Sequence, residues 1–338
     1  MCADVVPRRV ELKRPDWSTP VSRTPVSRTW AQPVLHPPRM RILFITATRI
    51  GDAVLSTGLL DHLLRIHPEA RFTIACGPVA EGVFARMPRR EATLVVEKQR
   101  FDLHWLRLWR HTIGTLWDLV VDLRGSALSF FLVARRRALM RGGRRPGHKL
   151  EQLAAALGLS TPPQPVSWTD AADRARADML LPAGGRYVGL GPTANWSGKA
   201  WPAERFAALF SAVRDQALPG ARPVVFAGPG PVERAMAAPV LAALPDAIDL
   251  TGRLSLPEAS ACLSRCALFV GNDSGLMHLA GAAGVPTLGL FGPTSAAEYA
   301  PAGRRAAVAM ATGAAGAAPM DCLSVDAALA AALGLLRR

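Results

Sequence analysis

Asp273, Ser274, Gly275 and His278 lie within six positions, between an apolar run at 267–270 and an Ala/Gly-rich stretch with helical spacing. A strand, a turn and the start of a helix are predicted here, with the free amides of the helix pointing beyond the strand end. The positive end of the helix dipole and the small Ser and Gly residues suit a phosphate group. Because a carboxylate would repel phosphate, Asp273 is predicted to bind sugar hydroxyls or its own turn. The alternative is that Asp273 or Ser274 only caps the helix.

Three other loops carry a charged residue that could serve the same ligand. Lys199 stands among Gly, Ser and Asn after an apolar run, and Glu233 follows a Gly/Pro-rich loop where it could hold ribose hydroxyls. Asp52 follows the first apolar run, at the edge of the expected cleft. Each has a simpler interpretation: a surface lysine, a glutamate at a helix start, and an aspartate that caps a helix.

These loops need elements that hold them at one edge, and the chain has the alternating pattern of strands and helices. In the first half, β-rich apolar runs stand at 41–48, 72–76, 93–96 and 119–123, and the last of these leads through 124–126 into an expected helix. A second series stands at 186–191, 223–228, 248–250, 267–270 and 287–291. This alternation of strands and helices predicts an α/β protein with two doubly wound, Rossmann-like domains that face a central cleft. Ligands are expected beyond the carboxyl ends of the strands.

Proline-rich residues 160–182 separate the two series. We predict a disordered basic and Pro-rich arm at 1–39, an N-terminal domain at 40–170 and a C-terminal domain at 171–338. The last helical pattern, 325–336, belongs to the second domain or packs back on the first.

The net charge of +14 belongs to the first half of the chain. Residues 1–149 contain 26 Lys/Arg and 12 Asp/Glu, whereas residues 150–338 contain 14 of each. The densest basic part comprises Arg135, Arg136, Arg137, Arg141, Arg144, Arg145 and Lys149. It is a solvated face, or it binds an anionic membrane surface or an acidic substrate. Nucleic acid is the least favoured partner, because no nucleic-acid motif or set of interleaved aromatic residues accompanies the charge.

The absence of several motifs argues against the enzyme classes that need them. The sequence has no dinucleotide glycine fingerprint, no P-loop, no nucleophile elbow and no metal-ligand spacing, so neither metal nor cofactor is expected. The five cysteines form no CxxC pair and are interpreted as buried thiols of a reducing compartment, the cytoplasm.

Taken in order, these loops resemble glycosyltransferase family 9, the lipopolysaccharide heptosyltransferase family, from about residue 40 to residue 293. The resemblance rests on 50–57 (IGDAVLST), 121–125 (VDLRG), 199–206 (KAWPAERF), 251–256 (TGRLSL), 272–280 (NDSGLMHLA) and 291–294 (FGPT). After residue 294 the sequence becomes Ala/Gly-rich and departs from the pattern.

The resemblance implies a GT-B fold and an inverting, metal-independent transfer of heptose from ADP-heptose to the inner core of lipopolysaccharide. It implies that Asp52 is the general base, and it implies contacts to the donor and to the anionic acceptor. Asp122, which also follows a strand, is a rival for the base by its position. The donor contacts would come from Lys199, Glu233, Asp273, Ser274, Gly275 and His278. The acceptor contacts would come from Asp122, Arg124, Arg137 and Arg141. The enzyme would work in the cytoplasm, peripherally on the inner face of the inner membrane.

Three alternatives to heptose transfer from ADP-heptose remain open. The donor could be another nucleotide sugar, the enzyme could be a nucleotide-sugar epimerase of the same shape, or the protein could be a catalytically silent binder of nucleotide sugars or lipids. Asp52 and Lys199 together argue against silence, because a binder needs no base opposite its donor.

Overall fold

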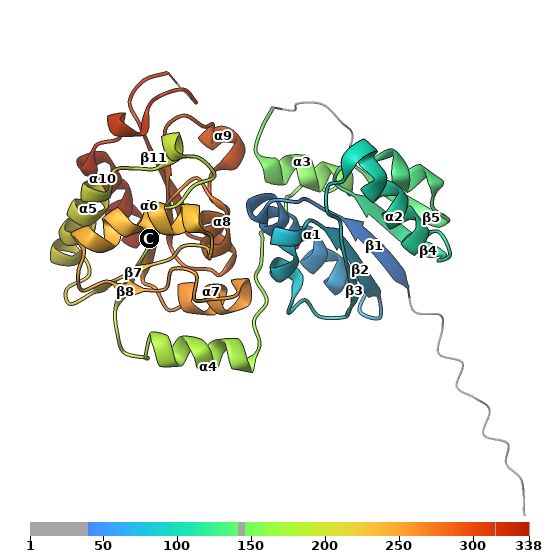
Figure 1. Ribbon diagram of the computed structural model, residues 1–338, viewed down its shortest axis with the longest axis horizontal. Helices are drawn as coiled ribbons and strands as arrows, with labels where there is room; N and C mark the ends of the chain where they lie inside the picture. Colours follow the sequence, from blue (N-terminus) through green and yellow to red (C-terminus); the bar gives the residue numbers. More distant parts are fainter. Residues whose placement is uncertain (1–39, 141–145, 315, 338) are drawn as a thin grey trace, which may run out of the picture. The chain divides into compact units, whose positions relative to one another are not determined.

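The computed structural model describes residues 40–140, 146–314 and 316–337, and residues 39–338 form one compact unit. Its strands build two parallel sheets (Figure 1), as the alternating pattern predicted. The first sheet has the order β3-β2-β1-β4-β5 and comprises β1 (Arg41–Ile45), β2 (Arg71–Cys76), β3 (Arg90–Val95), β4 (Trp117–Asp122) and β5 (Ala134–Leu139). Its central strand β1 is paired on both sides, which explains why residues 42–45 are fully apolar.

The second sheet has the order β11-β10-β9-β6-β7-β8. It comprises β6 (Tyr187–Gly191), β7 (Arg222–Val225), β8 (Ile248–Asp249), β9 (Leu268–Asn272), β10 (Thr287–Phe291) and β11 (Ala306–Met310). Strand β9 lies between β6 and β10, with every residue buried. The polar segment that follows β9 therefore emerges at the middle of the sheet edge, where ligands of open α/β sheets bind.

The longer helices follow the strands as the sequence predicted, and they include α1 (Ile50–Ile66), α2 (Leu103–Thr112), α5 (Ala203–Gln216), α6 (Pro231–Ala243) and α10 (Val325–Leu336). The shorter ones are α3 (Lys149–Ala156), α4 (Ala171–Leu180), α7 (Leu256–Leu263), α8 (Gly275–Ala282) and α9 (Ala296–Tyr299). Helix α10 packs against α5, β10 and β11, and thus on the second sheet. None of the helices in the described ranges is long and apolar enough to cross a membrane.

Two edge strands differ from the sequence interpretation. The segment after residue 126 was expected to be a helix, but it forms only the 3₁₀ turn η3 (Ala127–Phe131) and then strand β5, which carries three arginines of the basic cluster. Strand β11 lies in the stretch interpreted only as Ala/Gly-rich. Edge strands bury one side at most, so Arg and Ala take the place of the β-branched residues that reveal a central strand.

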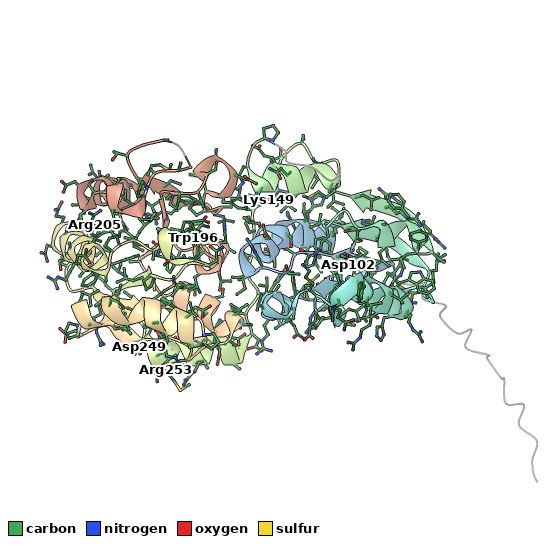
Figure 2. The ribbon with its side chains drawn as sticks, turned by 45° about the horizontal axis from the view of Figure 1, so that its top comes forward. Asp102, Lys149, Trp196, Arg205, Asp249 and Arg253 are labelled. Atoms are coloured by element: carbon green, nitrogen blue, oxygen red, sulfur yellow. The ribbon has the colours of Figure 1, made fainter. Side chains whose placement is uncertain are left out.

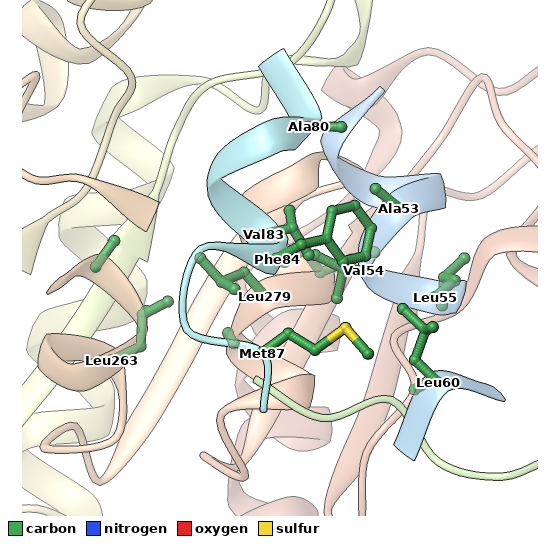
Figure 3. Close-up of a cluster of buried hydrophobic side chains, with 14 of the residues drawn as sticks. Ala53, Val54, Leu55, Leu60, Ala80, Val83, Phe84, Met87, Leu263 and Leu279 are labelled. Carbon is green, nitrogen blue, oxygen red and sulfur yellow. The ribbon is translucent and has the colours of Figure 1, made fainter. Parts of the chain in front are cut away.

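One buried apolar cluster runs from the first sheet's helices to the second's. It joins Val54 and Leu55 of α1 and Phe84 of the 3₁₀ helix η1 (Pro78–Phe84) to Leu263 of α7 and Leu279 of α8 (Figure 3). Helix α1 contacts α8, and α7 contacts η1. The N-terminal ends of α1 and α8, which carry the predicted site residues, are therefore held together by a continuous core.

The cysteines partly agree with the prediction of buried thiols. Cys76, Cys262 and Cys266 are buried, and Cys322 is exposed, contrary to expectation; Cys2 lies outside the described residues. Burial raises the pKa of Cys76 to about 12 and that of Cys262 to about 11, so both thiols are protonated at neutral pH. These two cysteines act as small apolar residues.

Candidate active site

Asp52 lies in the first turn of α1, which begins at Ile50. The N-cap residue of this helix is Arg49, and no side chain forms a capping hydrogen bond. The capping role considered for Asp52 is thus not what the structure shows. Its carboxylate is half-buried at the positive end of α1.

Two glycines bring the starts of α1 and α8 into contact. A Cβ atom on Gly51 would lie 2.9 Å from His278 Cδ2, and a Cβ atom on Gly275 would lie 2.9 Å from Ile50 Cβ. A side chain at either position would push the helices apart. The carboxyl end of β1 and the carboxyl end of β9, which belong to different sheets, therefore form one site.

Burial is the main influence on the Asp52 carboxyl, and it raises the pKa. Lys149 and Arg49 act in the opposite direction by attraction, while Glu298 and Asp273 add to the rise by repulsion. A carboxylate with a raised pKa is a better proton acceptor than an ordinary one. The influence of Asp273 also shows that Asp52 lies within electrostatic range of the polar segment after β9.

Lys199 and Asp273 form an ion pair whose Nζ and Oδ2 atoms are 2.5 Å apart. Lys199 ends the 3₁₀ helix η4 (Ser197–Lys199), and the two side chains are only 13% and 9% exposed. The lysine is therefore not the free surface residue of the simpler interpretation. An ammonium group has three donors, so this pairing leaves two for other acceptors, such as phosphate oxygens.

The start of α8 offers unsatisfied polar groups. Ser274 is its N-cap residue, but the Ser274 side chain forms no capping hydrogen bond, and its buried Oγ has no partner in the described part of the chain. The buried His278 Nδ1 is in the same situation. Buried polar atoms normally have partners, so these two atoms are candidates for contact with a ligand. Simple capping by Ser274 does not describe this segment.

His278 stays neutral at physiological pH. Burial lowers its pKa to about 4, and the charges of His148 and Lys199 act in the same direction, whereas Asp273 opposes them. Tyr299 belongs to the same group of residues: burial raises its pKa to about 12, with contributions from Asp52 and Glu298. Lys199, Lys149 and Arg49 are cations near His278 and Asp52 in the described part of the chain.

A buried amide holds the donor-side loops together. Asn272, the last residue of β9, donates from Nδ2 to Pro192 O at 2.7 Å and accepts from Trp201 N at 3.1 Å. These bonds join the end of β9 to both ends of the loop that carries Lys199. Trp196 of this loop is shown in Figure 2, and its ring packs so closely on Gly198 that a Cβ atom there would lie 1.8 Å from it.

Two hydroxyl groups were not proposed from the sequence as site residues. Thr251 Oγ1, after β8, and Thr294 Oγ1, after β10, are buried without a hydrogen-bond partner among the described residues. Both threonines lie within motifs on which the family resemblance rests, and this membership could have identified them from the sequence. Like Ser274, they follow the carboxyl ends of strands of the second sheet.

Glu233 lies in the first turn of α6 and folds back over the glycine loop before it. A Cβ atom on Gly230 would lie 2.2 Å from Glu233 Oε2, so the carboxylate lies directly over this glycine. Glu233 is half-buried and stands beyond the end of β7. The arrangement keeps a carboxylate at the second sheet's ligand-binding edge.

The predicted acceptor residues divide into different environments. The fully buried Asp122 accepts hydrogen bonds from Arg124 N, Ser126 N and Ser126 Oγ at 2.6–3.0 Å, so it organises its own turn. The Arg137 guanidinium donates to the carbonyls of Ser129, Leu132 and Ala134. Arg124 is exposed, with its guanidinium 5.2 Å from the Trp105 ring. Arg141 lies outside the described residues.

Lys149, which the sequence interpretation placed only in the basic cluster, is a residue of the site. It begins α3 (Figure 2), and it is the cation with the largest effect on the Asp52 carboxyl. Its neighbour His148 is within 3.0 Å of Ala300 O through Nε2, which connects the start of α3 to the end of α9. In residues 40–140, 146–314 and 316–337, no three His, Cys, Asp or Glu side chains gather in a way that could hold a metal ion.

Comparison with known proteins gives one family. A family model described as glycosyltransferase family 9 (heptosyltransferase) matches residues 147–321. Lipopolysaccharide heptosyltransferase 3 of Escherichia coli is 30% identical over 287 residues, which cover 72% of this chain and 81% of that protein.

Solved structures share the fold. A glycosyltransferase family 9 structure from Veillonella parvula has a TM-score of 0.75 at 23% identity and covers 88% of this chain and 97% of its own. E. coli ADP-heptose lipopolysaccharide heptosyltransferase II has a TM-score of 0.68 at 21% identity and covers 88% and 99%. The likeness confirms the GT-B fold that the sequence resemblance implied.

Proposed function

The chain belongs to glycosyltransferase family 9, the heptosyltransferases, and from this premise we propose that it transfers heptose from ADP-heptose to the inner core of a lipopolysaccharide precursor, with inversion. The enzyme is a glycosyltransferase by family. The donor nucleotide, the sugar and the stereochemical course are the proposed part. The choice of ADP-heptose is supported by one relative of the same fold, which is named E. coli ADP-heptose lipopolysaccharide heptosyltransferase II.

The observation that carries the mechanism is the position of Asp52 across from the start of α8. Gly51 abuts His278, and the Asp273 charge acts on the Asp52 carboxyl. A carboxylate from the first sheet thus stands opposite a candidate diphosphate site on the second. Inverting transfer requires this opposition, because the acceptor hydroxyl must attack from the face opposite the departing diphosphate.

We assign the proton transfer to Asp52. The acceptor oxygen forms a bond to the anomeric carbon while the bond from that carbon to the diphosphate oxygen breaks, and the electron pair leaves with ADP. The hydroxyl proton passes to the Asp52 carboxylate. The raised pKa favours this step, and Lys149 and Arg49 keep the carboxyl ionised before it.

We assign donor binding to the second sheet. The amides at the start of α8, with Ser274 and Gly275, would hold the diphosphate, and the remaining donors of Lys199 would bind its oxygens. Asp273 and His278 would contact the donor sugar or its phosphate, and Glu233 the ribose. This assignment uses the unpartnered Ser274 Oγ and His278 Nδ1.

The proposed acceptor contact comes from the first sheet. Arg124 is exposed beside the turn that Asp122 organises, and we propose that it meets an acceptor phosphate. Asp122 would act by shaping this turn. We leave Arg137 out of the proposed contacts, because its guanidinium is already bonded to three carbonyls. We also propose that the enzyme works in the cytoplasm, at the inner face of the inner membrane, because a lipid-anchored acceptor must be reached at a membrane surface.

The test is a transfer assay with the purified full chain. ADP-, UDP- and GDP-sugars are offered in parallel with truncated lipopolysaccharide acceptors, and the products are analysed by mass spectrometry and NMR. We expect product from ADP-heptose, with the anomeric configuration opposite to that of the donor. Product from a different nucleotide sugar would correct the donor, retained configuration would refute the role of Asp52, and no product from any donor would favour a silent binding protein.

A further inference from the structure

A group of large apolar side chains points into solvent on the first sheet's side of the molecule. Phe101 is 86% exposed, Phe130 67% and Phe131 68%. Leu103, Leu106 and Val133 are each about half exposed. These six residues come from the 3₁₀ helix η2 (Arg100–Asp102), helix α2 and the η3–β5 segment. Large apolar side chains gathered on one surface mark a binding site for a protein or a membrane.

Contacts between these segments make them one surface, which we call the α2 face. Helix α2 contacts both η2 and η3. Trp109 of α2 donates from Nε1 to Phe131 O at 3.2 Å, and the Arg124 guanidinium lies over the Trp105 ring. The aromatic tips of η3 are thereby anchored to the helix that carries Leu103 and Leu106.

The backbone before α2 is strained, which indicates that the exposed apolar side chains have a function. Phe101 and Asp102, at the start of α2 (Asp102 is labelled in Figure 2), both have φ of 55°, which is the left-handed region. Two successive non-glycine residues in this region are costly, and such strain concentrates at functional segments. The strained turn carries the most exposed of these apolar side chains, Phe101.

The charge of the same surface is positive. Between residues 97 and 137, apart from Arg136, which projects from the opposite face of β5, the exposed basic residues are Lys98, Arg100, Arg107, Arg110, Arg124, Arg135 and Arg137. The acidic residues there are Glu97, Asp102, Asp118 and Asp122, of which Asp122 is buried and Asp118 pairs with Arg135. Arg107 and His111 also line a cavity of about 280 Å³ between α2 and β3. Apolar tips set among arginines complement an anionic lipid surface.

We propose that the α2 face docks on an anionic bilayer, with Phe101, Phe130 and Leu106 in the interface and Arg107 and Arg110 on lipid phosphates. This proposal rests on the proposed function, because it says how an enzyme with a lipid-anchored acceptor reaches it. The surface consists entirely of described residues and includes neither Asp52 nor the donor loops.

The test is co-sedimentation of the full chain with vesicles of phosphatidylcholine, alone or mixed with phosphatidylglycerol. We expect binding to the mixed vesicles that weakens as salt is added. Phe101→Ser/Phe130→Ser should raise the lipid concentration for half-maximal binding at least about tenfold. Arg107→Glu should raise it at least about fivefold, as expected for one lost basic residue. Met179→Ser and Arg222→Glu are matched controls on exposed residues elsewhere, and circular dichroism checks folding.

Wild-type protein that binds neither kind of vesicle would overturn the proposal, and so would variants that bind like wild type. A transfer assay with a lipid-free core oligosaccharide separates the two proposals. The α2-face variants should keep turnover on this acceptor and lose it on a vesicle-embedded acceptor. If the wild type transfers to neither acceptor yet binds mixed vesicles as expected, the proposed function fails while the docking surface stands.

Discussion

The two sheets present different kinds of carboxylate to the site. Asp273, at the end of β9, is held by Lys199 in a short ion pair and is nearly buried. Asp52, after β1, is half-buried, its nearest cations act through the electrostatic field, and burial raises its pKa. An ion-paired carboxylate orders its neighbours, whereas a carboxylate whose charged form is disfavoured by burial is ready to accept a proton.

Asp122 extends the comparison within the first sheet. It follows β4 as Asp52 follows β1, and by sequence position alone the two were rivals for the base. Hydrogen bonds from the turn at 124–126 occupy both Asp122 carboxylate oxygens. The difference teaches that position at a strand end identifies candidates, and that the partners of each carboxylate distinguish a base from a structural residue.

Asp52→Asn tests the contrast most directly and should have the largest effect. The amide cannot accept the hydroxyl proton, so we expect kcat to fall at least about 100-fold, while donor affinity and folding are kept. Asp61→Asn on the same helix is the control, because Asp61 pairs only with Arg65 on the surface side. Near-normal kcat at saturating donor and acceptor would return attention to Asp122.

Lys199→Ala tests the paired side of the contrast. Loss of a charge-assisted contact should weaken binding of ADP about 10- to 100-fold, because such contacts contribute about 1.5–3 kcal/mol. The variant also leaves Asp273 unpaired near the diphosphate, so Lys199→Ala/Asp273→Asn should recover part of the affinity. Titration calorimetry measures both, with Lys98→Ala as the control. Affinity equal to that of wild type in Lys199→Ala would limit the lysine to pairing with Asp273.

His278→Gln tests the burial of the donor-side residues through the pH dependence of the unfolding free energy. The folded pKa of His278 is about 4, below the ordinary 6.5, so between these values the unfolded chain binds more protons than the folded one. Stability from this group is full above pH 6.5 and is lost as pH falls toward 4. Between pH 7 and pH 5 the wild type should lose about 2 kcal/mol more unfolding free energy than the variant.

Urea unfolding at both pH values measures this difference, with His111→Gln on the exposed side of α2 as the control. Equal losses in wild type and His278→Gln would contradict a buried, neutral His278.

Lys149→Met should have the smallest effect and a definite direction. Lys149 lowers the pKa of Asp52, so its removal should raise that pKa further above the ordinary value. The ionised base is then lost at a higher pH, and the acidic limb of the kcat profile should move upward. Lys98→Met is the control. A limb that stays in place would mean that a different group controls it.

Much of the fold could be predicted, because strand and helix periodicity is local. The predicted strands of both sheets are present, and so are the helices that begin near residues 275 and 325. Strands β5 and β11 were missed because their Arg- and Ala-rich sequences have few of the β-branched and aromatic residues that indicate a strand, and the expected helix after residue 126 was wrong for the same reason.

The sequence by itself determined the two-sheet α/β class, the family and the candidates Asp52, Lys199 and the segment 273–278, because loops after parallel strands share one edge. Only the tertiary structure decided how these residues are used. The Lys199–Asp273 pair spans 74 residues of sequence, and the contact between Gly51 and His278 joins different sheets. The burial that raises the pKa of Asp52, like the hydrogen bonds that occupy Asp122, depends on packing and strand order, which no local pattern records.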